Sequence, residues 1–280
     1  MIATPIPRET LLHVVKTLPA APHILASLGN LLLDGNSDME EIVRLLRCDA
    51  ALTARIIRIS NSTFYNSGTR YAALDEALSR VGFTEVYRLT GLAAISQIAD
   101  QELKTYGITG AQLRENSLLT ALIAEELAGF AGIDPSHAYT AGLLRSIGKV
   151  ALDRLMRGPG YAGGFDAHAH AGLAEWEVGL VGLSNCAAAA VILTEWRFPT
   201  ATINGIRDHY LLTPVGSTLA HVINLAASAA DRGGHALPGE TRYWDVAPEK
   251  LAAAGVESAH IDEAMRRALE LFGPLRAAVS

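Results

Sequence analysis

The amino-acid sequence predicts an all-α fold. Half of the 280 residues are hydrophobic, yet only 6% are aromatic. Apolar residues recur at helical spacing along nearly every segment, and long alternating segments, which typify half-buried strands, are absent. A chain of this length can bury a sizeable core. These observations together favour packed helices over sheets.

The first hundred residues predict six helices with recognisable ends. Ser37 and Glu40 have the spacing of a capping box, and Asp49 and Thr84 stand where helices can be capped. Gly82 is placed to end a helix. The expected helices cover residues 8–17, 23–33, 37–47, 50–60, 72–81 and 84–98.

Two glycines within residues 103–111 interrupt the pattern and indicate a boundary between lobes. Beyond it, Asp134 and Pro135 form a cap with proline at the first helical position. Glycine-rich residues 157–172 and residues 235–248 predict irregular chain. Helices are expected at 112–130, from 135 onward, at 173–181, 185–197, 200–209 and 217–231, followed by two short helices. The predicted parts are therefore 1–108, 109–235 and a carboxy-terminal extension, 236–280.

Charge and cysteine content exclude some classes of protein. The formal net charge is −6, and nucleic-acid binders usually carry a basic excess. Cys48 and Cys186 are too few for a disulfide framework, which suits a reducing compartment. No signal peptide is evident, and no apolar run approaches the ~18–20 residues of a membrane span. We therefore expect a soluble cytoplasmic protein that binds neither membrane nor nucleic acid.

One stretch, AGLLRSIGKVAL at residues 141–152, places Arg145 and Ser146 inside an apolar helical pattern. The frame Leu-Leu-Arg-Ser-Ile-Gly-Lys resembles the Leu-Leu-His-Asp-Ile-Gly-Lys motif of metal-dependent HD phosphohydrolases. LPAAPHILASLGNLL, RCDAALTARIIRISNSTFY and LDEALSRVGFTEVYRL, earlier in the chain, resemble the amino-terminal part of the HDOD (HD-related output domain) branch. The resemblance covers about residues 8–232. It implies a bacterial signalling module with an amino-terminal helical bundle packed on a degenerate HD-like bundle.

The resemblance also shows what the chain has lost. Other ligand positions fall at Asn116, Asn185, Asn224 and Ala227, and a His-His pair is reduced to His209-Tyr210. A guanidinium stays protonated and repels cations, so the arginine of the motif opposes metal binding. A hydrolase of this type needs several ligands around its metal ions. We therefore expect no catalytic residue, no metal and no cofactor.

Two interpretations of the altered pocket remain open. In the first, Arg145 pairs with a carboxylate such as Asp208 or Glu177, and Ser146 bonds to the preceding helical turn; an unpaired buried charge would be very costly. In the second, the pocket receives a small anion, such as a nucleotide second messenger, through the guanidinium. The residues of this candidate site are Asn116, Arg145, Ser146, Asn185, His209 and Asn224.

A candidate partner surface lies in the first lobe. Arg55 and Arg58 share a helix face, and Asn61, Phe64 and Tyr65 follow in a polar turn. Phe64 and Tyr65 are more often a core plug than a docking site. Trp196 and Phe198 are predicted core residues.

Three functions are therefore weighed, in this order. The first is an adaptor that binds a signalling or regulatory protein, with homo-oligomer formation as an open alternative. The second is a receptor for a small anionic ligand. The third is a phosphohydrolase with an unusual metal set, in which His168 or His170 joins His209; a glycine-rich loop holds ligands poorly, so this ranks last.

Overall fold

A computed structural model describes residues 6–19, 21–33, 39–66, 68, 70–158, 163–210, 216–244 and 246–279. It confirms the all-α prediction, because the described residues contain helices and a single isolated β-bridge, Leu103 to Ile108. The chain divides into two compact units. Unit 1 is Met1–Leu18 with Ala99–Leu269, and unit 2 is Pro19–Ile98 with Glu270–Ser280. The expected boundaries at 108 and 235 stay predictions.

Unit 2 is a small helical bundle built from short amphipathic helices. Residues such as Leu25, Leu28, Ile56 and Leu78 face inward and are almost fully buried. Helices α2 and α6 pack together, and α4 and α5 both contact α6. The helices are α2 (Ala21–Leu33), α3 (Met39–Leu46), α4 (Ala50–Ser60), α5 (Leu74–Val81) and α6 (Phe83–Ile98).

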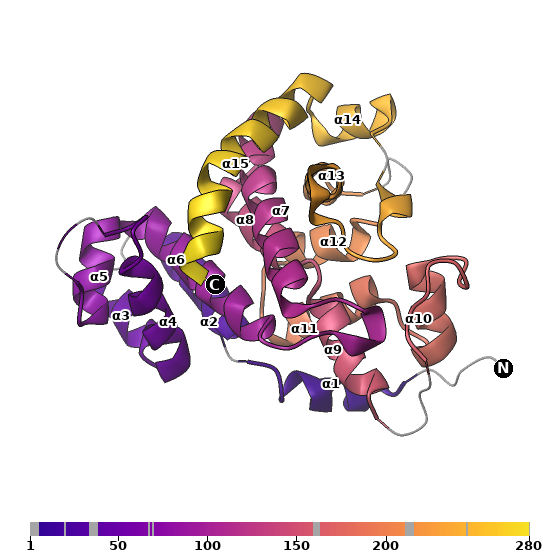
Figure 1. The fold of residues 1–280 in the computed structure, drawn as a ribbon, viewed down its shortest axis with the longest axis horizontal. Coiled ribbons are helices and arrows are strands. Elements are labelled where there is room, and N and C mark those ends of the chain that lie inside the picture. Colours follow the sequence, from indigo (N-terminus) through magenta and orange to yellow (C-terminus); the bar gives the residue numbers. More distant parts are fainter. Residues whose placement is uncertain are drawn as a thin grey trace. The chain divides into compact units, whose positions relative to one another are not determined.

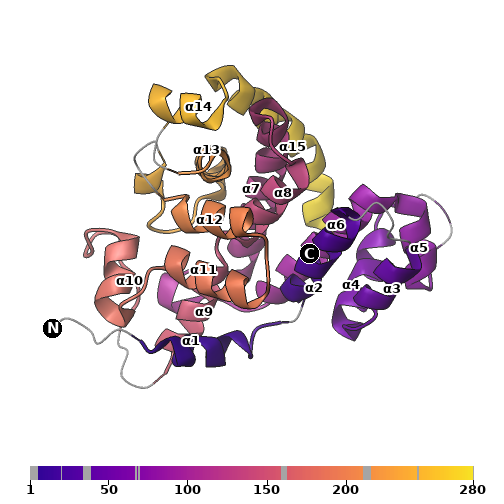
Figure 2. The ribbon, with the colours of Figure 1, turned by 180° about the vertical axis from the view of Figure 1, so that it is seen from behind.

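Unit 1 holds the longer helices. Helices α7 and α8 run alongside each other, and α13 packs on α7 (Figure 1). Figure 2 shows α13, α12, α11 and α9 following one another across the unit, each in contact with the next. The helices are α1 (Arg8–Val15), α7 (Gly110–Ala131), α8 (Pro135–Leu144), α9 (Ile147–Met156), α10 (Leu173–Val181), α11 (Asn185–Glu195), α12 (Thr200–Asp208), α13 (Thr218–Ala230) and α14 (Pro248–Ala254).

Most of the expected helix ends are confirmed. The Asp49 side chain accepts from Leu52 N at 2.9 Å, and Asp134 accepts from His137 N at 3.0 Å. Gly82 ends α5 with φ 81°, a left-handed conformation that favours glycine. Helix α6 begins at Phe83, one residue before the expected start at Thr84. Ser37 lies outside the described residues.

The carboxy-terminal end differs from the prediction of two short helices. Helix α14 is short, but α15 (Ser258–Val279) has 22 residues and contains Pro274. Trp196 and Phe198 are buried, as predicted. Of the described helices, none alone has the length and hydropathy of a membrane span; α10 and α11 reach it only as a pair, bent by 69° between them.

Candidate functional site

The polar residues of the motif lie at the break between α8 and α9. Helix α8 ends at Leu144, Arg145 and Ser146 form the break, and α9 begins at Ile147. Helix α8 packs on α7, and α9 packs on α11, so the break lies inside unit 1. The Arg145 side chain is completely buried there.

Arg145 is paired with Glu240, which lies 95 residues later in the chain. Nη1 and Nη2 of the guanidinium donate to Oε1 and Oε2 of the carboxylate, each at 2.8 Å. Nη2 also donates to Oδ1 of Asn116 at 2.5 Å. Such two-bond pairing fixes the geometry of both groups as well as joining their charges. At the site that the sequence predicted as an altered pocket, the guanidinium is therefore occupied by a carboxylate of the same chain.

A second buried cation reaches the same carboxylate. Lys149 Nζ, one helical turn after Arg145, contacts Glu240 Oε1 and donates to the Tyr210 hydroxyl at 2.8 Å. That hydroxyl in turn donates to Glu240 Oε1 at 2.6 Å. The side chains of Lys149 and Glu240 are both 0% exposed. Two cations and a phenol thus converge on one carboxylate.

We call Arg145, Lys149, Tyr210 and Glu240 the buried cluster. Their contacts set the charge states of Glu240, of Tyr210 and of the neighbouring His209. Burial opposes ionisation of Glu240, but the adjacent Arg145 and Lys149 overcome it and hold the pKa of Glu240 well below its ordinary value of 4.5. Burial, reinforced by Glu240, raises the pKa of Tyr210 well above 10.0. Burial, and next the charge of Arg145, lower the pKa of His209 from 6.5 to about 3. At neutral pH the histidine and the phenol are therefore uncharged.

The three asparagines at expected ligand positions all bond to the protein itself. Asn116 Nδ2 donates to the His235 carbonyl at 2.6 Å. Asn185 Nδ2 donates to Glu177 Oε2 at 2.9 Å. Asn224 Nδ2 donates to the carbonyl oxygens of His209 and Tyr243, and Asn224 Oδ1 accepts from Lys250 Nζ at 2.9 Å. Each amide thus serves as a link between segments of unit 1.

His209 and Ser146 keep polar atoms that no described group satisfies. The Nδ1 atom of His209 lies 2.6 Å from the Ile206 carbonyl, so Nδ1 carries the proton in the neutral ring. Nε2 of His209, Oγ of Ser146 and Nε of Arg145 have no hydrogen-bond partner. The expected bond from Ser146 to the preceding turn is therefore wrong.

The two carboxylates expected to pair with Arg145 are occupied elsewhere. Asp208 pairs with its neighbour Arg207, at 2.6 Å. Glu177 accepts from the Tyr106 hydroxyl at 2.8 Å and from Asn185 N at 2.7 Å. Burial raises the pKa of Glu177 above 4.5. An internal ion pair at Arg145 is present, but with a different partner.

The cluster does not fit a divalent metal ion. The Arg145 guanidinium and the Lys149 ammonium contact the one carboxylate of the cluster, that of Glu240. Both positive groups repel a metal cation. Within the described part of the chain, no group of three His, Cys, Asp or Glu side chains is arranged to hold a metal. His168 is exposed, and His170 stacks on Phe165 with ring centroids 5.7 Å apart. Neither is brought together with His209 in such a group.

The candidate partner surface lies in unit 2, and its residues differ in exposure. Asn61 bonds to Tyr71 through both ends of its amide, so it ties the turn to the chain that follows. The Tyr65 hydroxyl donates to Glu85 at 2.9 Å. Phe64 is 39% exposed, so it is not the expected core plug, and Arg58 is exposed on α4. Arg55 is half-buried.

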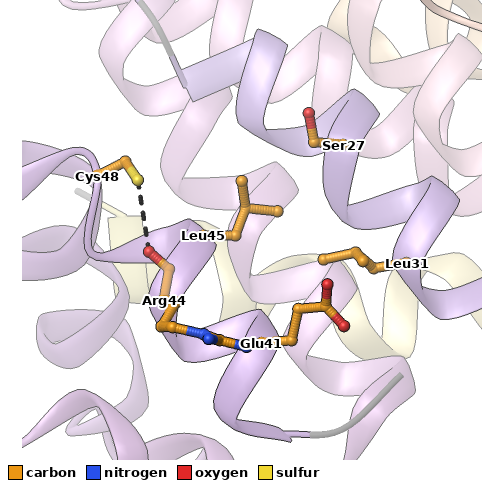
Figure 3. A pocket seen from close by; sticks show the side chains of 6 residues that line it. All are labelled: Ser27, Leu31, Glu41, Arg44, Leu45 and Cys48. Atoms are coloured by element: carbon orange, nitrogen blue, oxygen red, sulfur yellow. Dashed lines mark hydrogen bonds between the residues drawn. The ribbon is translucent and has the colours of Figure 1, made fainter. Parts of the chain in front are cut away.

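Unit 2 also contains an open pocket of about 590 Å³ between α2 and α3. Figure 3 shows the Leu31 and Leu45 side chains facing this hollow, with Glu41 and Arg44 at its edge. The exposed thiol of Cys48 donates to the Arg44 carbonyl at 3.4 Å. Nothing in the sequence singled out this place.

Sequence reasoning missed Glu240, Lys149 and Tyr210. Lys149 is the last residue of the motif's frame, and Tyr210 stands at the second position of the expected His-His pair. Glu240 lies in the irregular stretch HALPGETRYWDVAP, beyond the residues that carry the resemblance. A buried arginine requires a carboxylate, and an acidic residue amid aromatic and apolar neighbours was the available signal.

Comparison with known proteins places this arrangement in context. A family model described as "HDOD domain" matches residues 18–212, which leaves Glu240 outside the match. No curated protein matches the chain. Several solved structures do match, and at identities below 25% they show the fold alone.

An HDOD domain protein of unknown function from Geobacter sulfurreducens is 19% identical, with a TM-score of 0.67 over 97% of both chains. A candidate phosphohydrolase from Shewanella amazonensis SB2B is 22% identical, with a TM-score of 0.66 over 97% of this chain and 98% of the other. A candidate signal transduction protein from Marinobacter aquaeolei VT8 is 19% identical, with a TM-score of 0.68, over 97% of this chain and 64% of the other.

Proposed function

The chain belongs to the HDOD family, as its motifs predict, and from that premise we propose that it is a non-catalytic signalling module that acts by binding another protein. A structural neighbour named as a candidate signal transduction protein supports the regulatory part of this proposal. Fold alone does not determine function, so the argument depends on the site.

The ion pair between Arg145 and Glu240 carries the proposal. It occupies the place where the resemblance expects the first two metal ligands, and Lys149 adds a second positive charge. Hydrolysis by this family's chemistry requires metal-activated water, which a cation-rich and fully buried cluster does not favour. The same residues instead provide hydrogen bonds that join α7, α9, Tyr210 just after α12, and the segment after α13.

Protein binding is supported by the exposed side chains around the turn after α4. Phe64 is one of the few large apolar side chains that the described chain exposes, and Arg58 lies exposed on the preceding helix. Aromatic and arginine side chains are the usual anchors of protein interfaces. We assign the partner surface to Arg58 and Phe64, with Arg55 and Tyr65 as supporting residues.

The test of the non-catalytic assignment is metal content. The purified untagged chain is exposed to manganese, iron and zinc, desalted, and analysed by mass spectrometry, and each sample is assayed for phosphodiester hydrolysis. We expect metal well below one ion per chain and no hydrolysis above background. Near-stoichiometric metal with hydrolysis that His209→Gln abolishes would overturn the assignment.

The partner surface is tested by matched substitutions. Phe64→Ser and Arg58→Glu are compared with Val178→Ser, which changes an apolar side chain that is 49% exposed on α10. Protein captured from the source cells is identified and its affinity measured with each purified variant. We expect the changes at Phe64 and Arg58 to weaken binding at least about tenfold, an amount typical of interface anchors, and Val178→Ser to leave it unchanged. Equal binding by all variants would contradict this surface.

A further inference from the structure

The donors around the Glu240 carboxylate are unevenly divided between its two oxygens. Oε1 receives three of them, from Arg145 Nη1, Lys149 Nζ and the Tyr210 hydroxyl, while among the described residues Oε2 receives Arg145 Nη2 alone. A carboxylate oxygen offers about two lone-pair sites, so Oε1 is over-committed. Arg145 Nε, in addition, has no acceptor among the described residues. This donor set suits a group with more than two acceptor oxygens.

The charge of the cluster points the same way. Arg145 and Lys149 are fully buried, and both contact the Glu240 carboxylate directly. Glu177, a buried carboxyl group that interacts with Lys149 through its charge, forms its hydrogen bonds with Tyr106 and Asn185. In direct contact, two cationic side chains therefore share one carboxylate.

Glu240 belongs to a segment between two helices that has residues at the surface. We call residues 231–244, which join α13 to α14, the strap (Figure 1). Leu237, Glu240 and Tyr243 point inward and are buried, whereas Thr241 and Arg242, directly after Glu240, are exposed. The buried carboxylate is therefore carried by a segment whose next two residues lie at the surface.

The backbone of the strap contains two turns at glycine. Gly234 has φ 87° and Gly239, directly before Glu240, has φ 79°. Both values lie in the left-handed region, which side chains other than glycine rarely adopt. Withdrawal of Glu240 would require the strap to rotate at these turns and to release the hydrogen bonds that Asn116 and Asn224 donate to its carbonyl oxygens.

We propose that the pocket formed by Arg145, Lys149 and Tyr210 binds a phosphate-class oxyanion, and that Glu240 is the chain's own occupant, which such an anion displaces. A phosphate offers four oxygens, and arginine binds two of them in parallel, as it now binds the carboxylate. The inference adds a ligand to the regulatory role proposed above and depends on that role only in treating the pocket as metal-free.

The experiment uses the full chain in buffer with a metal chelator. Glu240→Ala and Glu240→Gln remove the internal anion, and Glu249→Gln, at an exposed position on α14, is the matched control. Inorganic phosphate is titrated by calorimetry at constant ionic strength. Removing a competing internal occupant raises apparent affinity, so we expect both Glu240 variants to bind phosphate at least about tenfold more tightly than the wild type and the Glu249 control.

Two further arms locate the site. Arg145→Leu added to Glu240→Gln is expected to abolish binding. In the wild type, saturating phosphate is expected to change the fluorescence of Trp244, in the strap, and Trp244→Phe is expected to remove that change. Folded Glu240 variants, checked by circular dichroism, that bind no phosphate would overturn the proposal.

Two other outcomes would also count against it. If formate stabilises Glu240→Ala as much as phosphate does, the pocket is a carboxylate site and the assignment to phosphate fails. If the Glu240 variants bind phosphate but the wild type shows no response, Glu240 is a permanent occupant and displacement is wrong. Because the metal measurement is made separately, neither failure can be mistaken for failure of the non-catalytic assignment.

Discussion

Gly148 lies directly against the backbone of Asn185. A Cβ atom added at Gly148 would stand 1.8 Å from the Asn185 carbonyl oxygen, closer than any real contact of that kind. Helices α9 and α11 therefore approach each other through a glycine that has no replacement. This contact gives a physical reason for a glycine in the Ile-Gly-Lys frame.

The first prediction concerns that glycine. Gly148→Ala forces α9 and α11 apart, and we expect it to lower the free energy of unfolding by about 3 kcal/mol or more, as overpacking against a rigid backbone does. Gly129→Ala is the control, because Gly129 lies in α7 with nothing within 4 Å of the added Cβ. It should be neutral or stabilise by about 0.5–1 kcal/mol. Urea denaturation of both variants checks this; equal stabilities would contradict the close contact.

The second prediction concerns the buried ion pair. Arg145→Met leaves the buried Glu240 carboxylate without its guanidinium, and removing one partner of such a pair costs about 3–5 kcal/mol. Glu240→Met should have a similar effect, because it leaves Arg145 unpaired.

The double variant tests whether the two residues act together. With both charges replaced by methionine, we expect a loss of unfolding free energy smaller than the sum of the single losses, measured as a double-mutant cycle. Strictly additive losses would show that the two side chains do not depend on each other.

The third prediction is a pH dependence carried by His209. Its pKa in the folded chain is about 3, below the ordinary 6.5, so the unfolded chain binds the proton first as the pH falls. The contribution of neutral His209 to the free energy of unfolding is complete above pH 6.5 and is lost as the pH falls from 6.5 toward 3. The free energy of unfolding falls by up to about 1.4 kcal/mol for each pH unit.

The measurement is a set of urea denaturation curves between pH 6.5 and pH 5, above the range where most carboxylates titrate. His209→Gln should remove the part of the pH dependence that His209 causes. The difference in free energy of unfolding between wild type and variant should therefore shrink as the pH falls. A constant difference across this range would mean that His209 becomes protonated in the folded chain.

The fourth prediction concerns Asn224. Its amide bonds to two backbone carbonyl oxygens and to Lys250, and all three hydrogen bonds are lost in Asn224→Ala. Each buried polar group left unpaired costs about 1–3 kcal/mol, so we expect a loss of at least about 2 kcal/mol. Asn204→Ala on α12, where the asparagine is only half-buried, should cost much less. Thermal unfolding of the two variants separates these outcomes.

The helices were predictable because their causes are local. Asp49, Asp134 and Gly82 act on residues within one turn of themselves, and the structure has each of them at the predicted end. The start of α6 was predicted one residue late, because α6 continues almost directly from α5, an arrangement that propensity does not reveal.

The site was only partly predictable, because its causes are distant. Burial of Arg145 and its need for a carboxylate follow from the apolar pattern around it. The identity of that carboxylate does not, since Glu240 is brought to it by the strap and not by any periodicity. Asp208 and Glu177 were the nearer choices in the resemblance, and each turned out to have partners of its own.

The separation of 95 residues between Arg145 and Glu240 also has a consequence for biosynthesis. A ribosome adds about 5–20 residues per second, so the arginine is incorporated about 5–20 seconds before its carboxylate. During that interval α7, α8 and α9 exist without the charge that allows Arg145 to enter the core. Final packing of this unit is therefore a late event of translation, and a nascent chain stalled before Glu240 should stay open to proteases and chaperones.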